Sequence, residues 1–198
     1  MESEPSSEGF GTFLIVWIGQ LISVLGSTLT GFAMGIWVYI ETGSVTTFAL
    51  IIVAANVPGI LIAPLAGSII DRHDRRLVML VADVAAGIST GAAAILFISD
   101  SLHIWHLYPI VAIGAIANSF QEPAYAASVP LLVPKRHLGR ANGLVQVGPS
   151  LGIVVAPIAA GALIATVGLG VVLMIDIVTF VFAVTTLVFV RIPRPPPI

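Results

Sequence analysis

The sequence contains no cysteine, which excludes disulfide bridges, thiolate metal ligands and cysteine nucleophiles. Charge is also scarce: 9% of the residues are charged, whereas soluble globular domains carry about 25%. The net charge is -2 and there is no basic block, so a nucleic-acid partner is not indicated. Motifs for a serine triad, for zinc-dependent hydrolysis and for nucleotide-phosphate binding are missing as well. We therefore expect neither an enzyme nor a bound cofactor.

Apolar residues are abundant and make up 58% of the chain. A bilayer core roughly 30 Å thick needs about 20 apolar residues in a helix, because lipid cannot satisfy backbone polar groups. Six stretches meet this requirement and predict an all-α membrane protein with a transmembrane bundle over residues 13–190, after a cytoplasmic tail at 1–12. The predicted spans are Phe13–Ile40, Thr46–Ile70, Leu77–Ser99, His106–Val133, Ala141–Val167 and Leu169–Val190.

All eight basic residues follow the second, fourth or sixth span, and the other connections contain none. They are Arg72, Arg75, Arg76, Lys135, Arg136, Arg140, Arg191 and Arg194. Because positive charge marks cytoplasmic loops, both termini are expected in the cytoplasm, and the expected location is the plasma (inner) membrane.

The chain contains an internal repeat. A shift of 93 residues places Gly59 on Gly152 and Asp83 on Asp176, so spans two and three match spans five and six. A unit of three spans is odd, and the second copy is therefore inverted in the membrane. We expect two inverted three-helix repeats at about 13–99 and 106–190, an arrangement typical of secondary transporters.

The same shift pairs two rows of small residues that allow close helix contact, either within this bundle or with a second one. The rows are Ala55, Gly59, Ala63, Gly67 and Gly148, Gly152, Ala156, Ala160.

Two spans carry polar residues along one face, at a spacing of three and four. They are Gln20, Ser23, Ser27 and Thr30 in span one, and Asn118, Gln121, Glu122, Tyr125 and Ser128 in span four. A polar face on a membrane helix points at the bundle interior or at a wet cavity. Gln20, Asn118, Gln121, Glu122 and Tyr125 are therefore candidates for binding a substrate or an ion.

Glu122 is the ionisable residue that we expect to bind a coupling ion or a cationic substrate. About 15 residues separate it from the outer end of span four, roughly 22 Å along a helix, and a charge at that depth is costly. The alternative is a protonated Glu122 hydrogen-bonded to Gln20 or Asn118. Asp83 and Asp176 are shallower, and structural hydrogen bonding is favoured over ion coupling for both. His103 and His106 do not complete a metal site, so we expect no bound metal.

The segment from Gly67 to Arg76 resembles the loop motif G-x-x-x-D-R-x-G-R-R of the major facilitator superfamily. The matching residues are Gly67, Asp71, Arg72, Arg75 and Arg76, while Asp74 replaces a glycine. The resemblance implies one six-helix half of that fold, with residues 191–198 beginning the linker to a second half. It also implies that Asp71 and Arg75 form an ion-pair latch on the cytoplasmic side, which holds one conformational state through the other half.

A second segment is similar to the family's antiporter motif in helix five, G-x-x-x-G-P-x-x-G-G. It keeps Gly152, Pro157 and Gly161 and has alanine at two glycine positions. The run from Phe120 to Asn142 resembles the macrolide-efflux and siderophore-export branch. The exporters' helix-four motif R-x-x-Q-G, however, is changed to Asn118 and Glu122 around a retained Gln121. Coupling by the usual arginine is therefore not expected.

Together these features imply a secondary active exporter of small amphipathic molecules, working by alternating access beside a second six-helix half. That half would be a separate chain or a second copy of this one. The alternatives are a non-transporting or decayed half-transporter that serves as a membrane scaffold, and an uptake porter.

Overall fold

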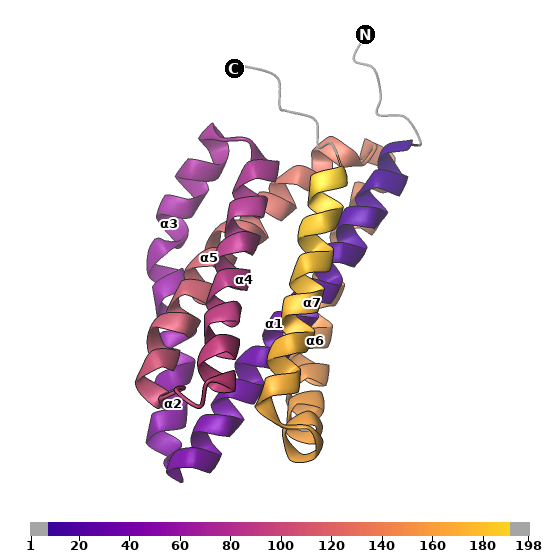
Figure 1. Cartoon of the computed structure of the whole chain (residues 1–198). Coiled ribbons are helices and arrows are strands. Elements are labelled where there is room, and N and C mark those ends of the chain that lie inside the picture. Colours follow the sequence, from indigo (N-terminus) through magenta and orange to yellow (C-terminus); the bar gives the residue numbers. More distant parts are fainter. Residues whose placement is uncertain (1–7, 191–198) are drawn as a thin grey trace.

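The computed structural model describes residues 8–190, and every regular element in this range is a helix (Figure 1). Residues 1–7 of the predicted tail at 1–12 and the predicted linker at 191–198 lie outside the described residues, and residues 8–12 of that tail belong to the first helix. The elements are α1 (Glu8–Thr42), α2 (Val45–Ala54), α3 (Val57–Arg72), α4 (Arg75–Ile98), α5 (Ile104–Leu132), the short helix η1 (Lys135–His137), α6 (Leu138–Thr166) and α7 (Gly168–Phe189).

The prediction of membrane-spanning helices is confirmed. Five stretches in the described part are long and apolar enough to cross a bilayer, namely α1, α2 with α3, α4, α6 with η1, and α7. The remaining long helix, α5, has 29 residues and packs among them, and it carries the polar stripe predicted for span four. The protein is therefore a multi-pass membrane protein with the helices of half a major facilitator fold.

The second predicted span differs from the structure in one respect, because it is broken into α2 and α3 around Ala55 and Asn56. Pro58 lies in the first turn of α3 and has no N–H to donate to the Ala54 carbonyl. The Asn56 side chain instead donates to the carbonyl of Ile52, at 2.8 Å. The helix is therefore interrupted near Pro58, and the chain continues across the membrane in α3.

The helices of the two predicted repeats exchange partners. Helix α1 packs mainly against α6 and α7, whereas α5 packs mainly against α3 and α4. Helices α4 and α7 also pack against each other. The first helix of each predicted repeat thus packs on the second and third helices of the other, as two equivalent units would.

Small residues permit the closest of these contacts. A Cβ on Gly59 would lie 2.7 Å from the backbone oxygen of Ala115, so α3 and α5 approach closely there. On α6 the whole row Gly148, Gly152, Ala156 and Ala160 is buried inside this bundle, with Gly148 and Gly152 against α1. For that row the structure favours packing within the bundle over contact with a second one.

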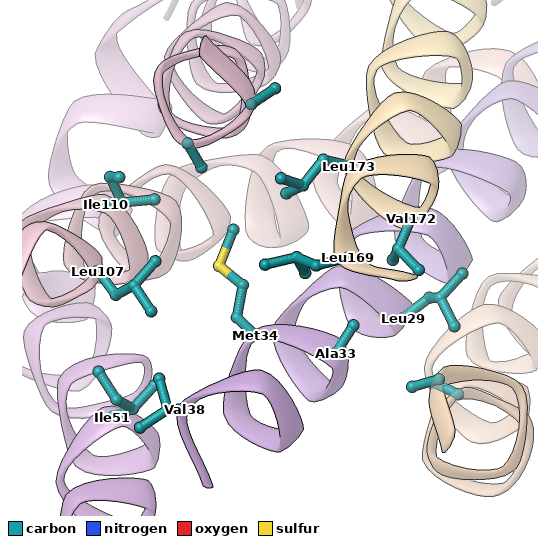
Figure 2. Packing of buried hydrophobic residues seen from close by; sticks show 14 residues of the cluster. Leu29, Ala33, Met34, Val38, Ile51, Leu107, Ile110, Leu169, Val172 and Leu173 are labelled. Carbon is teal, nitrogen blue, oxygen red and sulfur yellow. The ribbon is translucent and has the colours of Figure 1, made fainter. Parts of the chain in front are cut away.

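Two apolar clusters occupy opposite ends of the bundle. Near the end that holds residues 8 and 190, Phe13, Met79, Val129 and Leu187 are buried together. At the other end Met34, Leu107, Leu169 and Leu173 belong to a second cluster (Figure 2). The connections from α3 to α4 and from α5 to α6 lie at the first end (Figure 1). All the described basic residues are in these two connections or within a few residues of them.

Candidate binding cavity

A cavity of about 530 Å³ lies between the two apolar clusters. This volume is in the range of small-molecule sites. Five helices contribute to its wall: α1, α4, α5, α6 and α7. The polar residues that line it are Gln20, Ser23, Ser27, Thr28, Asp83, Thr90, Asn118, Gln121, Glu122, Tyr125, Gln146 and Asp176.

All five residues expected to bind a substrate or an ion line this cavity: Gln20, Asn118, Gln121, Glu122 and Tyr125. The polar faces of α1 and α5 therefore meet in one place, although they are about 100 residues apart in sequence. Of the other stripe residues, Ser23 and Ser27 also line the cavity, while Thr30 and Ser128 are buried outside its wall.

Asp83 is buried in this wall and is connected to both polar stripes. Its Oδ2 accepts a hydrogen bond from Nε2 of Gln20 at 3.2 Å. The Oε1 of Gln20 in turn accepts from Nε2 of Gln121. Three side chains from α4, α1 and α5 thus form a continuous chain of hydrogen bonds, and each of them is at least nine-tenths buried.

Asp176, which the repeat relates to Asp83, is held by hydroxyl groups. Oδ1 accepts from Ser27 at 3.1 Å and Oδ2 accepts from Thr90 at 2.9 Å. Both carboxylates therefore make the hydrogen bonds expected from the sequence. They also line the cavity, which their positions in the sequence do not predict.

The cavity is open on the side between α5 and α6. Among its lining residues, Asn118 and Glu122 of α5 and Gln146 and Ile153 of α6 are exposed. The amide of Gln20 is occupied by Asp83 and Gln121, so the alternative in which Gln20 holds a protonated Glu122 is not what the structure shows.

Charge in the cavity wall has one sign. Asp83, Glu122 and Asp176 bring three carboxyl groups, and no Lys, Arg or His lines the described cavity. Burying like charges together is costly unless a cation or a proton offsets them. The wall is therefore suited to binding a positively charged ligand or a proton. Trp17 and Phe180 add apolar, aromatic surface to it.

Two further wall residues bear on recognition. The Tyr125 hydroxyl is buried and has no hydrogen-bond partner among the described residues. Trp17 is half-buried in the wall, and its Nε1 donates to the Leu144 carbonyl at 2.7 Å.

The loop motif between α3 and α4 is arranged differently from the predicted latch. Asp71 and Arg72 are exposed, and Asp71 and Arg75 form no ion pair in the described structure. Arg75 instead donates from Nη1 to the Ala127 carbonyl at 3.0 Å, in the turn that Pro130 disrupts.

The last arginine of the motif ties two helix ends together. Arg76 donates from Nε to the Leu187 carbonyl at 2.8 Å and from Nη2 to the Val188 carbonyl at 2.6 Å. A cation at the carboxyl end of α7 stabilises that end. Asp74, the departure from the family motif, is the N-cap of α4, and its side chain accepts from the Arg76 N–H at 3.0 Å.

The helix-five motif lies on α6. Gly152 is buried, and a Cβ there would lie 3.2 Å from the Thr28 hydroxyl, so it allows α6 to approach α1. Pro157 lies inside the helix, and a Cβ added to Gly161 would meet nothing within 4 Å. Of the two glycines, Gly152 is the one that lies at a close contact between helices.

Two histidines lie at the start of α5, His103 as its N-cap and His106 in its first turn. The backbone N–H of His103 donates to Nδ1 of His106 at 3.0 Å, and the two rings are stacked. No group of three potential metal ligands occurs in the described part of the chain.

Comparison with known proteins places the chain beside transporters. The family model described as Major Facilitator Superfamily matches residues 16–198. Macrolide efflux protein A of Streptococcus pyogenes is 29% identical over 182 residues, which cover 92% of this chain and 45% of that protein. Macrolide efflux protein A of Enterococcus faecalis is 31% identical over 137 residues, or 69% of this chain and 42% of that protein.

A multidrug efflux pump, Tap of Mycolicibacterium fortuitum, is 25% identical over 167 residues, covering 80% of this chain and 40% of the pump. The chain thus spans less than half the length of each of these relatives.

Proposed function

Because this chain belongs to the major facilitator superfamily, we propose that it forms one half of a secondary active transporter that exports small amphipathic molecules by alternating access. The observation that carries the proposal is the cavity between two apolar clusters, lined by three carboxyl groups and no basic residue among those described. The position matches the family resemblance, since secondary transporters bind substrates near the midplane between repeats.

The wall chemistry supports a cationic substrate with an apolar body. In this proposal Glu122 is the counter-charge, because it is exposed to the cavity opening and makes no hydrogen bond to the described residues. Asn118, Gln20, Gln121 and Tyr125 supply hydrogen bonds, and Trp17 supplies an aromatic face for the cation.

A second six-helix half completes the proposed transporter, either as a separate chain or as a second copy. The opening between α5 and α6 is where the cavity lacks a wall, and the relatives are about twice as long as the matched region. We place the protein in the plasma (inner) membrane with both termini in the cytoplasm, because the basic residues gather at that end.

Export is favoured over uptake by the helix-five motif of Gly152, Pro157 and Gly161 and by the efflux names of the relatives. The competing functions are a non-transporting scaffold and an uptake porter.

Flux measurements in liposomes separate these functions. The purified chain, reconstituted with an acidic lumen, should accumulate radiolabelled erythromycin, a macrolide with a tertiary amine, above the level in protein-free liposomes. Glu122→Gln keeps the shape of the side chain and should lower this flux. Accumulation above that of protein-free liposomes would exclude the scaffold. Accumulation equal to theirs would contradict a transporter made of two copies of this chain and leave the scaffold or a second half on a separate chain. Added accumulation that does not depend on the pH gradient would contradict proton-driven export.

The loop motif supplies a separate proposal, that Asp71 is a latch contact for the second half. Asp71 is exposed and makes no contact that stabilises the described bundle. Asp71→Asn should therefore leave the thermal unfolding of the chain unchanged and still lower erythromycin flux. Arg75→Ala is the comparison variant, because it removes the bond to the Ala127 carbonyl and should lower stability as well. Unchanged flux in Asp71→Asn would remove the latch.

A further inference from the structure

A second hollow, separate from the binding cavity, is an apolar groove between α3 and α4. Both helices pack on α5 but scarcely touch each other, so α5 forms the floor of the groove (Figure 1). The groove has a volume of about 410 Å³, and its walls include Ile69, Leu77 and Val81, all of them exposed. Small residues make room for it, because Ala82 and Ala117 line it and are buried.

The groove and the binding cavity lie on different faces of α5. Ile113, Ala117 and Phe120 line the groove at a spacing of three and four. Asn118 and Glu122, on another face of the same helix, line the cavity. The proposed second half covers the cavity opening between α5 and α6, which leaves the groove facing lipid.

The length of the groove matches one leaflet of a bilayer. Helix α4 lines it from Leu77 to Ala85, roughly 12 Å at 1.5 Å per residue, and half of a bilayer core is about 15 Å. An empty groove would lose dispersion contacts with the atoms around it, so an acyl chain from that leaflet should fill it. Because lipid tails are as apolar as leucine, the groove alone does not select one lipid over another.

The mouth of the groove, at the connection from α3 to α4, carries positive charge. The ring of His73 lines the groove, and its Nδ1 lies 2.8 Å from the Ile69 carbonyl. A carbonyl only accepts, so Nδ1 carries a proton, and Nε2 has no partner among the described residues. The neighbouring Arg72 is exposed, and its side chain makes no hydrogen bond or ion pair there. Residues 71–76 include three arginines and two aspartates, so the connection is net positive.

We propose that this groove binds an anionic phospholipid, with one acyl chain in the groove and the phosphate at Arg72 and His73. Basic pockets between membrane helices are known to hold lipid headgroups in this way. A zwitterionic lipid supplies the same chain, but its cationic group offsets the attraction. The lipid belongs to the leaflet at the connection from α3 to α4, which is the cytoplasmic leaflet in the proposed topology. The inference requires that the chain spans a membrane and does not require that it transports.

Quenching of tryptophan emission by brominated lipid tests the proposal, because bromine on an acyl chain quenches at short range. Val81→Trp places the reporter in the groove. Val181→Trp on α7 is the matched control, since the two valines are 60% and 53% exposed. They also lie at similar distances from the same end of the bundle. Both variants are made in a chain whose own tryptophans, Trp17, Trp37 and Trp105, are replaced by phenylalanine.

The reporters are reconstituted in phosphatidylcholine vesicles in which about one lipid in ten is brominated phosphatidylglycerol. A headgroup preference of about fivefold places the anionic lipid in the groove about a third of the time, so quenching of Val81→Trp should be about three times that of Val181→Trp. With brominated phosphatidylcholine as the minor lipid in phosphatidylglycerol, Val81→Trp should be the less quenched of the two. Equal quenching of both reporters by brominated phosphatidylglycerol would overturn the proposal.

Variants of the mouth assign the headgroup site. Arg72→Gln combined with His73→Gln should lower the quenching of Val81→Trp to the level of Val181→Trp. Arg136→Gln removes an exposed positive charge from the other connection at this end and should leave the excess unchanged. An excess that survives in the double variant would overturn the assignment to these two residues. If neither brominated lipid quenches Val81→Trp, protein covers the groove and the proposal is wrong.

A measurement on the wild-type chain does not depend on the reporters. After extraction in mild detergent from vesicles with equal amounts of the two lipids, mass spectrometry of the intact protein should show retained phosphatidylglycerol about five times as often as phosphatidylcholine. The double variant of Arg72 and His73 should retain the two lipids equally. Equal retention by the wild-type chain would contradict the proposal.

Discussion

At the scale of one residue, Tyr125 is a polar group in the cavity wall that an ordinary apolar core would not leave unpaired. Its hydroxyl is buried without a partner among the described residues, and leaving such a group unpaired costs about 1–3 kcal/mol. Tyr125→Phe should therefore raise the stability of the chain by about 1 kcal/mol, measured by thermal or denaturant unfolding in detergent.

The same variant tests whether the hydroxyl serves a ligand. Affinity for erythromycin, which carries hydroxyl and carbonyl groups, should fall in Tyr125→Phe. Affinity for tetraphenylphosphonium, which has no hydrogen-bonding group, should stay the same. Equal affinity for erythromycin in the two proteins would make Tyr125 a structural residue.

Which residues of the site can be predicted depends on their pattern in the sequence. The stripes on α1 and α5 are visible at a spacing of three and four, and Gln20, Asn118, Gln121, Glu122 and Tyr125 do line one cavity. Asp83, Asp176 and Gln146 are isolated on apolar helices, so periodicity gives no direction for them. Trp17 lies three residues before Gln20 and thus continues the stripe on α1, but an aromatic residue does not stand out on an apolar helix. For the two aspartates the repeat is the available signal, because equivalent buried charges point to equivalent positions in the wall.

At the scale of the helix, close packing should be sensitive to a single methyl group. Gly59 on α3 faces the backbone of Ala115 on α5, and a backbone cannot move aside as a flexible side chain can. Gly59→Ala should destabilise the bundle by about 1–3 kcal/mol through overpacking, measured as a lower unfolding midpoint in detergent.

Gly91 on α4 provides the matched control, since a Cβ there meets nothing within 4 Å. Gly91→Ala should be neutral or slightly stabilising, because alanine favours the helix by up to about 1 kcal/mol over glycine. Equal losses in the two variants would show that the contact between α3 and α5 is not as close as described.

The helices themselves are largely predictable, because about 20 apolar residues in lipid have one way to satisfy their backbone. The break between α2 and α3 is not predicted, even though Pro58 is plain in the sequence. Proline does not decide the matter alone, since Pro64, Pro123 and Pro157 lie inside continuous helices. Asp74 stands out in the sequence as a departure from the family motif, but its role as the N-cap of α4 depends on where that helix begins.

At the scale of the whole molecule, the distribution of basic residues predicts one orientation in the membrane. The connections before α2 and before α5 contain no Lys or Arg and should lie outside the cell. Because the chain has no native cysteine, Ser44→Cys and Ser101→Cys should react with a membrane-impermeant thiol reagent in intact cells. Gly139→Cys, at the opposite end of the bundle, should react only after the cells are opened. The reverse pattern would contradict the topology.

The binding of a cation in the cavity can be observed from inside the cavity itself. Trp17 is part of the wall and one of three tryptophans, so a chain with Trp37→Phe and Trp105→Phe reports on this site alone. Titration with tetraphenylphosphonium at fixed pH should change Trp17 emission to a saturable limit, and Glu122→Gln in the same background should weaken the affinity about tenfold, or about 1.4 kcal/mol. A titration without saturation, or one that Glu122→Gln leaves unchanged, would contradict the claim that this cavity binds cationic molecules.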